Sequence, residues 1–450
     1  MDNNIKDSDI EAIKNEDDDI IRENSHSQHH QSENHHSSHH HHHHHHHSSH
    51  HGRHHGSHHH SRHRSSNSNK KKIKINKPLA VTLSALMLAV LIIIALIFET
   101  MDLKSNQNVE NQLGEISSDI LSVELINAEG VLVKSAVNKY LLTDLLNPYN
   151  SNVLPSDFSS GEGRLDEQVP VSLKLSVKDG TAIFYKIELA QNDQFKDAIV
   201  SFIEANTAIH EFEHLYANTT YYYRVTAYTS KGAATSIGSF KTADTPRILS
   251  IEGLSNVRDI GNWRTDSGKR IKQGLLIRGT EMDGAVESGY HLTNDGMQDM
   301  LDIFGIKTDI DLRAQTSTSM DALGSRVEHR YYDMVMYSGI FTDEGKEKIR
   351  IVFSDLANPD NYPIYLHCTY GCDRTGTVCY LLEALLGVSR GDCLKDYGLS
   401  NLNIANIKAV EDGLKNYEGD TLKEQTESYL LSCGVSEYQI ESIRNIFLED

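Results

Sequence analysis

Cysteine, proline and tryptophan are scarce in this chain, which has 5 Cys, 7 Pro and 1 Trp among 450 residues. Five is an odd number and too few for a disulfide scaffold. All five lie in the last 83 residues, so cysteine serves at most one domain. A composition of 38% hydrophobic and 24% charged residues excludes a chain that is disordered throughout, a collagen and a polytopic membrane protein. The length alone favours two or three domains.

Positive charge is also in the minority. The chain has 63 acidic against 43 basic side chains, a formal net charge of −20, and the acidic excess follows residue 77. A surface of this sign repels a phosphate backbone, so nucleic acid is not expected as a partner.

Histidine is concentrated in one stretch. Residues 26–63 hold 22 of the 27 His, including an unbroken run from His39 to His47. The stretch has no apolar period, so we predict that residues 1–77 form a disordered, cytoplasmic tail. Dense imidazoles bind divalent zinc, nickel or copper weakly. Two interpretations therefore stay open, weak metal binding and a solvated low-complexity tail.

One long apolar run follows this tail. Residues 79–98 carry no charge, and a helix of that length spans roughly 30 Å, the thickness of the bilayer hydrocarbon core. Five lysines lie between residues 70 and 77, so the positive-inside rule puts the N-terminus in the cytoplasm and residues 99–450 outside. A cleaved signal peptide would need a shorter apolar region and a cleavage site soon after it. We therefore predict a single transmembrane helix.

The next two segments differ in pattern. Residues 99–165 are a linker or small segment of uncertain structure, in which 122–146 could form a strand and then a helix. Residues 166–245 contain short alternating apolar and polar runs separated by turns, which predict a β-sandwich. The order LYANTTYYYRVTAY, from Leu215 to Tyr228, resembles a fibronectin type III domain. That resemblance implies a spacer or binding module.

Residues 247–450 alternate strand-like and helix-like segments, an α/β pattern in which a central sheet is flanked by helices. Between a buried strand (362–368) and a buried helix (375–388) stands HCTYGCDRTG, from His367 to Gly376. A loop of this length can turn successive backbone N–H groups inward, and the helix N-terminus completes an anion site. Gly371 permits the tight turn that this geometry needs.

Cys368 and Arg374 stand at the two ends of this loop. A helix N-terminus and an arginine both stabilise a thiolate, so the anionic form of Cys368 is favoured. A thiolate held against a phosphate-sized site is a nucleophile for phosphoryl transfer. The planar fork of Arg374 matches two phosphoryl oxygens and stabilises their charge in the transition state.

Three other uses of these cysteines compete with this interpretation. A zinc site at His367, Cys368 and Cys372 lacks a second ligand pair at a suitable spacing. A constitutive disulfide between Cys368 and Cys372 would abolish the nucleophile, although a reversible one stays open as an inactive state. A cysteine merely buried at a strand end would leave the Asp-Arg-Thr-Gly sequence unexplained. That structural interpretation suits the other three cysteines.

The loop resembles the HCx5R signature of the cysteine-based protein phosphatases. Segments 256–279, 310–317 and 395–401 resemble motifs of the bacterial tyrosine phosphatases with lipid-phosphatase-like loops. The resemblance implies catalysis by Cys368 as nucleophile and Arg374 as phosphoryl ligand, with no metal and no cofactor. It also implies substrate-binding roles for the loop residues and supporting roles for two others: Thr369, Tyr370, Gly371, Cys372 and Thr375, and His367 and Asp311.

Two aspartates are candidates for the general acid. Trp263 is the only tryptophan and stands in a different context, so no WPD-type loop is visible. The resemblance favours Asp373, inside the loop, as the acid. Asp311 is then an orienting partner for Arg374 or the alternative acid, and its purely structural interpretation is an ion pair with Arg313.

One departure from the family bears on the substrate. Many members have Lys where this chain has Cys372, and without that charge a phosphoinositide is less well matched. We therefore expect a protein-tyrosine phosphatase anchored in a bacterial cell membrane, with its catalytic domain outside. It would hydrolyse phosphate monoesters of proteins or small molecules through a phosphocysteine intermediate. The alternatives are a phosphoinositide or inositol-phosphate phosphatase and an inactive surface-binding protein.

Overall fold

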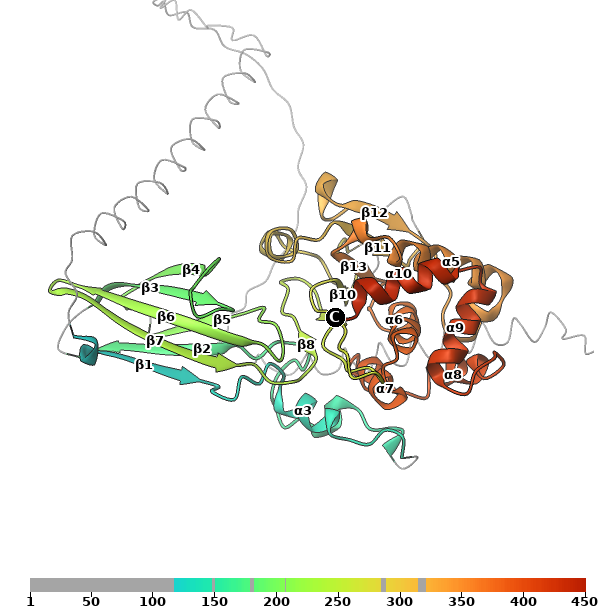
Figure 1. The fold of residues 1–450 in the computed structure, drawn as a ribbon, viewed down its shortest axis with the longest axis horizontal. Helices are drawn as coiled ribbons and strands as arrows, with labels where there is room; N and C mark the ends of the chain where they lie inside the picture. The colour runs from blue at the N-terminus through green and yellow to red at the C-terminus, as the bar shows by residue number, and fades with distance from the viewer. Residues whose placement is uncertain (1–116, 148–149, 179–181, 207, 285–288, 315–320) are drawn as a thin grey trace, which may run out of the picture. The chain divides into compact units, whose positions relative to one another are not determined.

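The structure, a computed structural model, describes residues 117–450 except 148–149, 179–181, 207, 285–288 and 315–320 (Figure 1). The described residues belong to one compact unit. The expected tail (1–77) and transmembrane helix (79–98) lie outside the described residues, and both stay predictions. In the part of the chain that is described, no helix combines the length and apolar character needed to cross a bilayer.

Two antiparallel sheets form the first part of the described chain. The order in one sheet is β1-β2-β5, with bounds Leu121–Ile126, Val171–Val177 and Ile209–Phe212. The order in the other is β4-β3-β6-β7, with bounds Ile199–Glu204, Ala182–Ala190, Thr220–Thr229 and Gly232–Lys241. Residues from both sheets, such as Leu173, Ile187 and Val225, share one buried cluster. The two sheets therefore form a β-sandwich.

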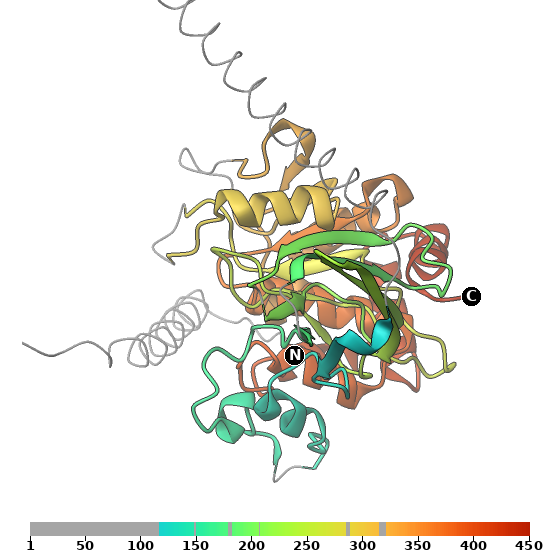
Figure 2. The same ribbon diagram turned by 90° about the vertical axis from the view of Figure 1, so that its left-hand side faces the viewer.

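This sandwich starts ahead of the expected boundary at residue 166. Its first strand, β1, pairs with β2 in the register Leu121↔Val177, and some 44 residues separate the two strands in the chain. That insertion holds α3 (Ser135–Leu141) and the 3₁₀ turn η3 (Pro155–Phe158). Tyr140 of α3 is fully buried in the core of the C-terminal helices, and Figure 2 shows the insertion (teal) beside them (red). The insertion separates β1 from its partner β2 in the chain. For this reason the alternating apolar and polar pattern alone predicted a sandwich that begins at residue 166, after β1.

A six-stranded mixed sheet organises residues 247–450. Its order is β12-β11-β13-β10-β9-β8. The first four strands are parallel to one another, and β9 pairs antiparallel with both β10 and β8. In chain order the bounds are β8 Arg247–Ile248, β9 Arg258–Asp259, β10 Leu276–Gly279, β11 Thr308–Asp311, β12 Glu328–Tyr331 and β13 Ile364–His367. The strands expected within 306–312 and 362–368 are thus central in the sheet.

Helices cover both faces of this sheet, so this part of the chain is mixed α/β (Figure 1). On one face Ile364 and Leu366 of β13 pack in a core with the larger C-terminal helices, and Tyr365 between them packs on the opposite face. The helices are α4 Asn294–Gln298, α5 Asp343–Leu356, α6 Asp373–Leu386, α7 Arg390–Gly398, α8 Lys408–Leu414, α9 Leu422–Ser432 and α10 Glu437–Phe447. One turn of π-helix, η4 (Asp299–Ile303), continues α4.

Candidate active site

The loop between β13 and α6, residues 368–374, is called the catalytic loop below. Cys368 follows the end of the central strand and is only 3% exposed. Gly371 has φ +67°, a left-handed conformation, and a Cβ there would lie 2.3 Å from the carbonyl oxygen of Gly279. No residue with a side chain fits that position without moving β10. The turn predicted at Gly371 is thus present, and β10 lies directly against it.

Three successive carbonyl groups of this loop are held from outside. The Thr369 oxygen accepts from the Glu281 N–H at 3.0 Å. The Tyr370 oxygen accepts from Asn256 Nδ2 at 3.1 Å, and the Gly371 oxygen accepts from a guanidinium nitrogen of Arg278 at 2.8 Å. In a trans peptide the N–H points opposite to the C=O of the same unit. The amides of residues 370, 371 and 372 therefore point to the other side, where they can surround an oxyanion.

The N-terminus of α6 adds to this positive field. The helix has 14 residues and begins after Cys372, whose side chain makes no capping hydrogen bond. Its first free N–H groups and its macrodipole favour an anion at the loop. A guanidinium nitrogen of Arg374 donates to Thr369 Oγ1 at 3.3 Å. Thr375 Oγ1 is buried without a hydrogen-bond partner among the described residues, so this hydroxyl is free to donate to a thiolate.

His367 supplies a buried charge next to Cys368. Its Nε2 lies 3.0 Å from Asp309 Oδ1, and its Nδ1 lies 3.2 Å from the Cys368 carbonyl oxygen. Burial alone would lower the pKa of His367, but the charges of Asp309 and Asp311 and the contact with Asp309 raise it to about 9. His329 contacts the same Asp309 carboxylate at 3.1 Å. His367 is therefore an imidazolium at neutral pH, with Nδ1 as a donor beside the loop.

Cys372 is a thiol in a structural position. It donates to the Tyr370 carbonyl oxygen at 3.2 Å and lies 3.5 Å from Asn256 Nδ2. Burial, and the charges of Asp373 and Cys368 after it, raise the pKa of Cys372 well above its ordinary value. The side chain is thus neutral and suited to hold the loop. All five cysteines, including Cys368, are free thiols in the structure.

Asp373 lies at the start of α6 beside two tyrosines. The Tyr337 hydroxyl, on the 3₁₀ turn η6 (Tyr337–Phe341), donates to Asp373 Oδ1 and lies 2.8 Å from the Tyr397 hydroxyl. Burial raises the pKa of Asp373, although the Tyr337 hydroxyl and the Arg374 charge lower it. A carboxyl group with a raised pKa stays protonated to higher pH, which is what a general acid requires. Tyr337 was missed in the sequence because no motif links it to the loop.

In the structure, Asp311 contacts Arg313 and not Arg374. Asp311 Oδ2 lies 2.7 Å from a guanidinium nitrogen of Arg313, and Asp311 Oδ1 accepts from the Arg313 backbone N–H at 2.8 Å. Glu281 and Asp283 also contact that guanidinium. The contacts of Asp311 therefore agree with its structural interpretation, an ion pair with Arg313. The orienting role toward Arg374 has no contact that supports it among the described residues.

A buried ionic network lies behind the catalytic loop. Asp396 of α7 accepts from Arg258 at 3.0 Å and from Arg278 at 2.8 Å, and all three side chains are at most 2% exposed. Burial raises the pKa of Asp396, but the two guanidinium groups hold it below its ordinary value. The carboxylate is thus ionised and fixes Arg278, which holds the Gly371 carbonyl. The segments 256–279 and 395–401 supply these residues, but only the fold brings them together.

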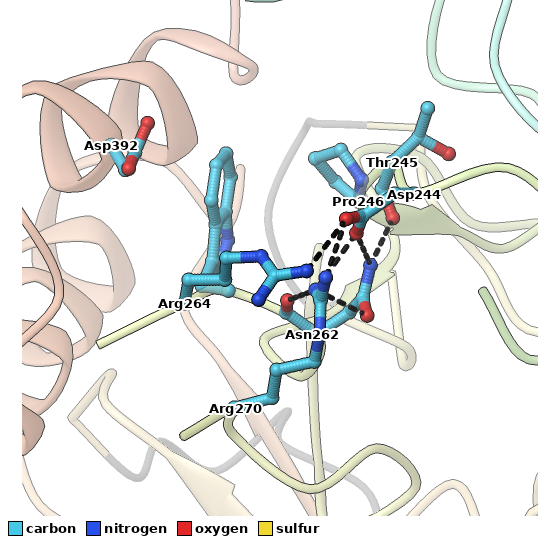
Figure 3. Close-up of a pocket in the computed structure, with 8 residues that line it drawn as sticks. Asp244, Thr245, Pro246, Asn262, Arg264, Arg270 and Asp392 are labelled. Atoms are coloured by element: carbon cyan, nitrogen blue, oxygen red, sulfur yellow. Dashed lines mark hydrogen bonds and ion pairs between the residues drawn. The ribbon is translucent and has the colours of Figure 1, made fainter. Parts of the chain in front are cut away.

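A pocket of about 160 Å³ is lined by residues 244–246, 262–264, 270 and 392 (Figure 3). Arg264 and Arg270 both form ion pairs with Asp244 at its wall, and Asn262 donates to the same carboxylate at 3.0 Å. No residue of the catalytic loop lines it. In the described part of the chain, no group of three or more His, Cys, Asp or Glu side chains is placed to hold a metal ion, and the histidine tract lies outside that part.

Comparison with known families supports the class of this site. Residues 249–433 match the profile of the tyrosine phosphatase family. This match covers β9 to β13, the catalytic loop and α4 to α9, and it begins after the sandwich and β8. The C-terminal part of the chain is therefore similar to the domains of this family.

Individual relatives are distant. A Cupriavidus necator protein named as a candidate tyrosine-protein phosphatase is 28% identical over 182 residues, which cover 34% of this chain and 63% of the relative. Among solved structures, the core catalytic domain of the PP-IP phosphatase SIW14 from S. cerevisiae, in complex with citrate, matches with a TM-score of 0.24 and 13% identity. That match covers 35% of this chain and 84% of that one. A likeness at this TM-score carries no argument about substrate.

Proposed function

We propose that the chain is a cysteine-dependent protein-tyrosine phosphatase that forms a phosphocysteine intermediate. The observation that carries this proposal is the outward anchoring of three successive carbonyls, of Thr369, Tyr370 and Gly371. That anchoring turns the amides of residues 370–372 to the opposite side, where they can bind an oxyanion. Such donors bind a tetrahedral dianion and stabilise its charge as phosphorus becomes five-coordinate, without reorganisation during the reaction.

The reaction runs in two steps. The Cys368 sulfur attacks phosphorus, the bond from phosphorus to the substrate oxygen breaks, and Asp373 gives its proton to that oxygen. Asp373, now a carboxylate, then takes a proton from water as that water attacks phosphorus. The sulfur–phosphorus bond breaks, inorganic phosphate leaves and Cys368 is a thiolate again. Arg374 binds the phosphoryl oxygens in both steps, and the Thr375 hydroxyl stabilises the departing thiolate.

Charge around the loop favours a substrate with a single phosphate. Arg313 is surrounded by three carboxylates, those of Glu281, Asp283 and Asp311, and the Glu281 backbone touches the loop itself. Cys372, a neutral buried thiol, occupies the position where many relatives have a lysine. These charges therefore repel a polyphosphorylated inositol more strongly than an aryl phosphate, which carries a single phosphate.

Aromatic residues support the same choice. The rings of Tyr370, in the loop, and Tyr290 meet edge to face with centroids 6.2 Å apart. Both side chains are partly exposed. Such a pair offers apolar surface to the ring of a phosphotyrosine next to the phosphate site.

We propose further that residues 79–98 anchor the enzyme in a cell membrane and that the sandwich is a fibronectin type III-like spacer. The uncharged 20-residue run supports the first part, and the three- and four-stranded antiparallel sheets support the second. The lysines before the run support a catalytic domain outside the cell.

A substrate panel on the full chain tests the proposed function. We expect turnover of phosphotyrosine peptides above that of phosphoserine peptides, inositol phosphates and phosphoinositides. Cys368→Ser should lower that turnover by at least about 10³-fold with an unchanged unfolding temperature, because the nucleophile is lost and the fold is not. Cys433→Ser is the matched control and should keep full activity, since Cys433 lies at the end of α9, outside the site. An active Cys368→Ser enzyme, or a preference for inositol phosphates, would contradict the proposal.

A further inference from the structure

A segment outside the phosphatase match contacts Asn256, which in turn holds the catalytic loop. Residues 150–170, called the connecting segment, precede β2 of the sandwich. Its Asp166 accepts a hydrogen bond from the Asn256 backbone N–H at 2.7 Å and another from the Ser255 hydroxyl. Arg164 donates to the same carboxylate at 2.9 Å and 3.1 Å. This carboxylate therefore fixes the backbone of Ser255 and Asn256, some 90 residues later in the chain.

Asn256 is the residue that passes this contact to the loop. Its φ of +54° is left-handed, a conformation that asparagine tolerates better than most residues but that still needs support. Its side-chain Nδ2 donates to the Tyr370 carbonyl oxygen, and its Oδ1 accepts from Arg258 at 2.6 Å. The backbone of Asn256 is thus held by Asp166 while its amide orients the Tyr370–Gly371 peptide.

We propose that Asp166 is a positioning residue of the catalytic loop, acting through Asn256, and that the connecting segment belongs to the catalytic unit. This inference rests on the proposed function, because the loop that it positions is the proposed phosphate site. Asp166 touches neither the nucleophile nor the phosphoryl ligand. It sets the angle at which one carbonyl is held, and so the direction of the amide that follows.

Other contacts fix the connecting segment on the same domain. Arg164 donates to the Leu254 carbonyl oxygen at 3.1 Å, and the Gln168 backbone N–H donates to Ser250 Oγ at 2.9 Å. At the other end, the Ser156 backbone N–H donates to Asn401 Oδ1 at 3.3 Å. Asp166 therefore lies on a segment that is tied to the domain on both sides and does not depend on a single exposed contact.

The charge state of Asp166 suits this role. Burial raises the pKa of Asp166, but Arg164, the Ser255 hydroxyl and the Asn256 N–H hold it below its ordinary value. The carboxylate is ionised at neutral pH, and hydrogen bonds to an ionised acceptor are the stronger kind.

A double-mutant cycle on the full chain tests the proposal. The variants are Asp166→Ala, Asn256→Ala and both together, with Glu167→Ala as the matched control, because Glu167 is the next residue and its side chain is 41% exposed. The readouts are the affinity for tungstate, a tetrahedral oxyanion, by calorimetry, and kcat and KM for an aryl phosphate. Asp166→Ala should weaken tungstate binding and lower kcat by about tenfold each, the loss of one charge-assisted hydrogen bond.

Coupling between the two sites separates positioning from a general effect on stability. If Asp166 acts through Asn256, adding Asp166→Ala to Asn256→Ala changes tungstate binding and kcat by less than about twofold. Asp166→Asn keeps one acceptor oxygen and the fold, and it should fall between wild type and Asp166→Ala. Glu167→Ala should match wild type in both readouts.

The outcomes distinguish this inference from the proposed function. A wild type that turns over no monoester, yet binds tungstate more tightly than Asp166→Ala, would refute the activity and leave the positioning role in place. Unchanged tungstate binding in folded Asp166→Asn and Asp166→Ala, or fully additive effects in the cycle, would overturn the positioning role. A wild type that does not bind tungstate would overturn both.

Discussion

The sandwich and the C-terminal domain (residues 247–450, the proposed catalytic domain) differ in the side chains that they bury. The sandwich core is apolar, with side chains such as Ile187 and Val225, and its ion pair between Arg224 and Glu188 leaves 34% of the arginine side chain exposed. The catalytic domain buries Arg278 and Asp396 beneath the loop with at most 2% exposure. Both domains have an apolar core, but the C-terminal domain also buries charges where backbone groups must be oriented.

This difference shows what the buried charges do. A buried ion pair is weak evidence for stability, because desolvation offsets most of the attraction. In the catalytic domain, however, Arg278 also holds the Gly371 carbonyl, and Arg258 holds the side chain of Asn256, which binds the next carbonyl upstream. We infer that these buried ions hold the catalytic loop in a backbone conformation that would otherwise be unfavourable.

The largest expected effect tests directly whether the buried ion pair and the partly exposed ion pair differ. Arg278→Ala leaves Asp396 with one partner in a buried site and frees the Gly371 carbonyl, and we expect about 3–5 kcal/mol of lost stability together with loss of turnover. Arg224→Ala in the sandwich removes a partly exposed pair and should cost about 1 kcal/mol with turnover unchanged. Calorimetry and steady-state kinetics on both variants give the result. Equal losses of stability would show that the two ion pairs do not differ as described.

A smaller effect concerns pH. The folded protein holds a proton on His367 up to about pH 9, whereas the unfolded chain releases it near the ordinary value of 6.5. The stabilisation from this proton is therefore complete below pH 6.5 and is lost as the pH rises through about 9. The unfolding temperature should fall over that window, and Asp309→Asn should flatten the fall because the buried anion is gone.

NMR titration of the His367 ring provides the check on that prediction. A ring that titrates below pH 6.5 would contradict the buried ion pair, whatever the unfolding temperature does. The sandwich offers the internal contrast, because burial and the charge of Arg247 lower the pKa of its His214 to about 4. The two histidines should therefore shift in opposite directions from the same ordinary value.

The smallest expected effect sharpens the assignment of the acid. The Tyr337 hydroxyl lowers the pKa of Asp373 against its burial, so Tyr337→Phe should raise that pKa further. The basic limb of the kcat profile should then move to higher pH, while kcat at neutral pH falls by roughly two- to tenfold because the acid is less well held. Tyr438→Phe is the matched control, since that side chain is 83% exposed. A basic limb that does not move would argue against Asp373 as the acid.

The turn and the helix start of the catalytic loop could be predicted from the sequence because the residues that form them are local. The spacing from Cys368 to Arg374, Gly371 and the helix start all lie within a few residues of one another. The sandwich could be predicted in kind from its alternation, but β1 could not be assigned to it, because the insertion with α3 separates β1 from its partner.

The parts that the sequence could not indicate depend on tertiary structure. Asp166 and Tyr337 each lie in a segment with no motif, and only the fold brings them to Asn256 and Asp373. Asp311 shows the converse case. The resemblance suggested a contact with Arg374, but the structure has the alternative that the sequence also allowed, a bidentate pair with Arg313, two residues away.

The most direct test of the account is to trap the intermediate. The full chain, mixed with an aryl phosphate and quenched with acid within one turnover, should carry covalent phosphate on the peptide that contains Cys368, as read by mass spectrometry. We predict that the phosphate lies on the Cys368 sulfur and that Asp373→Asn accumulates it, because water is no longer activated. Turnover without any phosphate on Cys368, or with phosphate on another residue, would contradict the account.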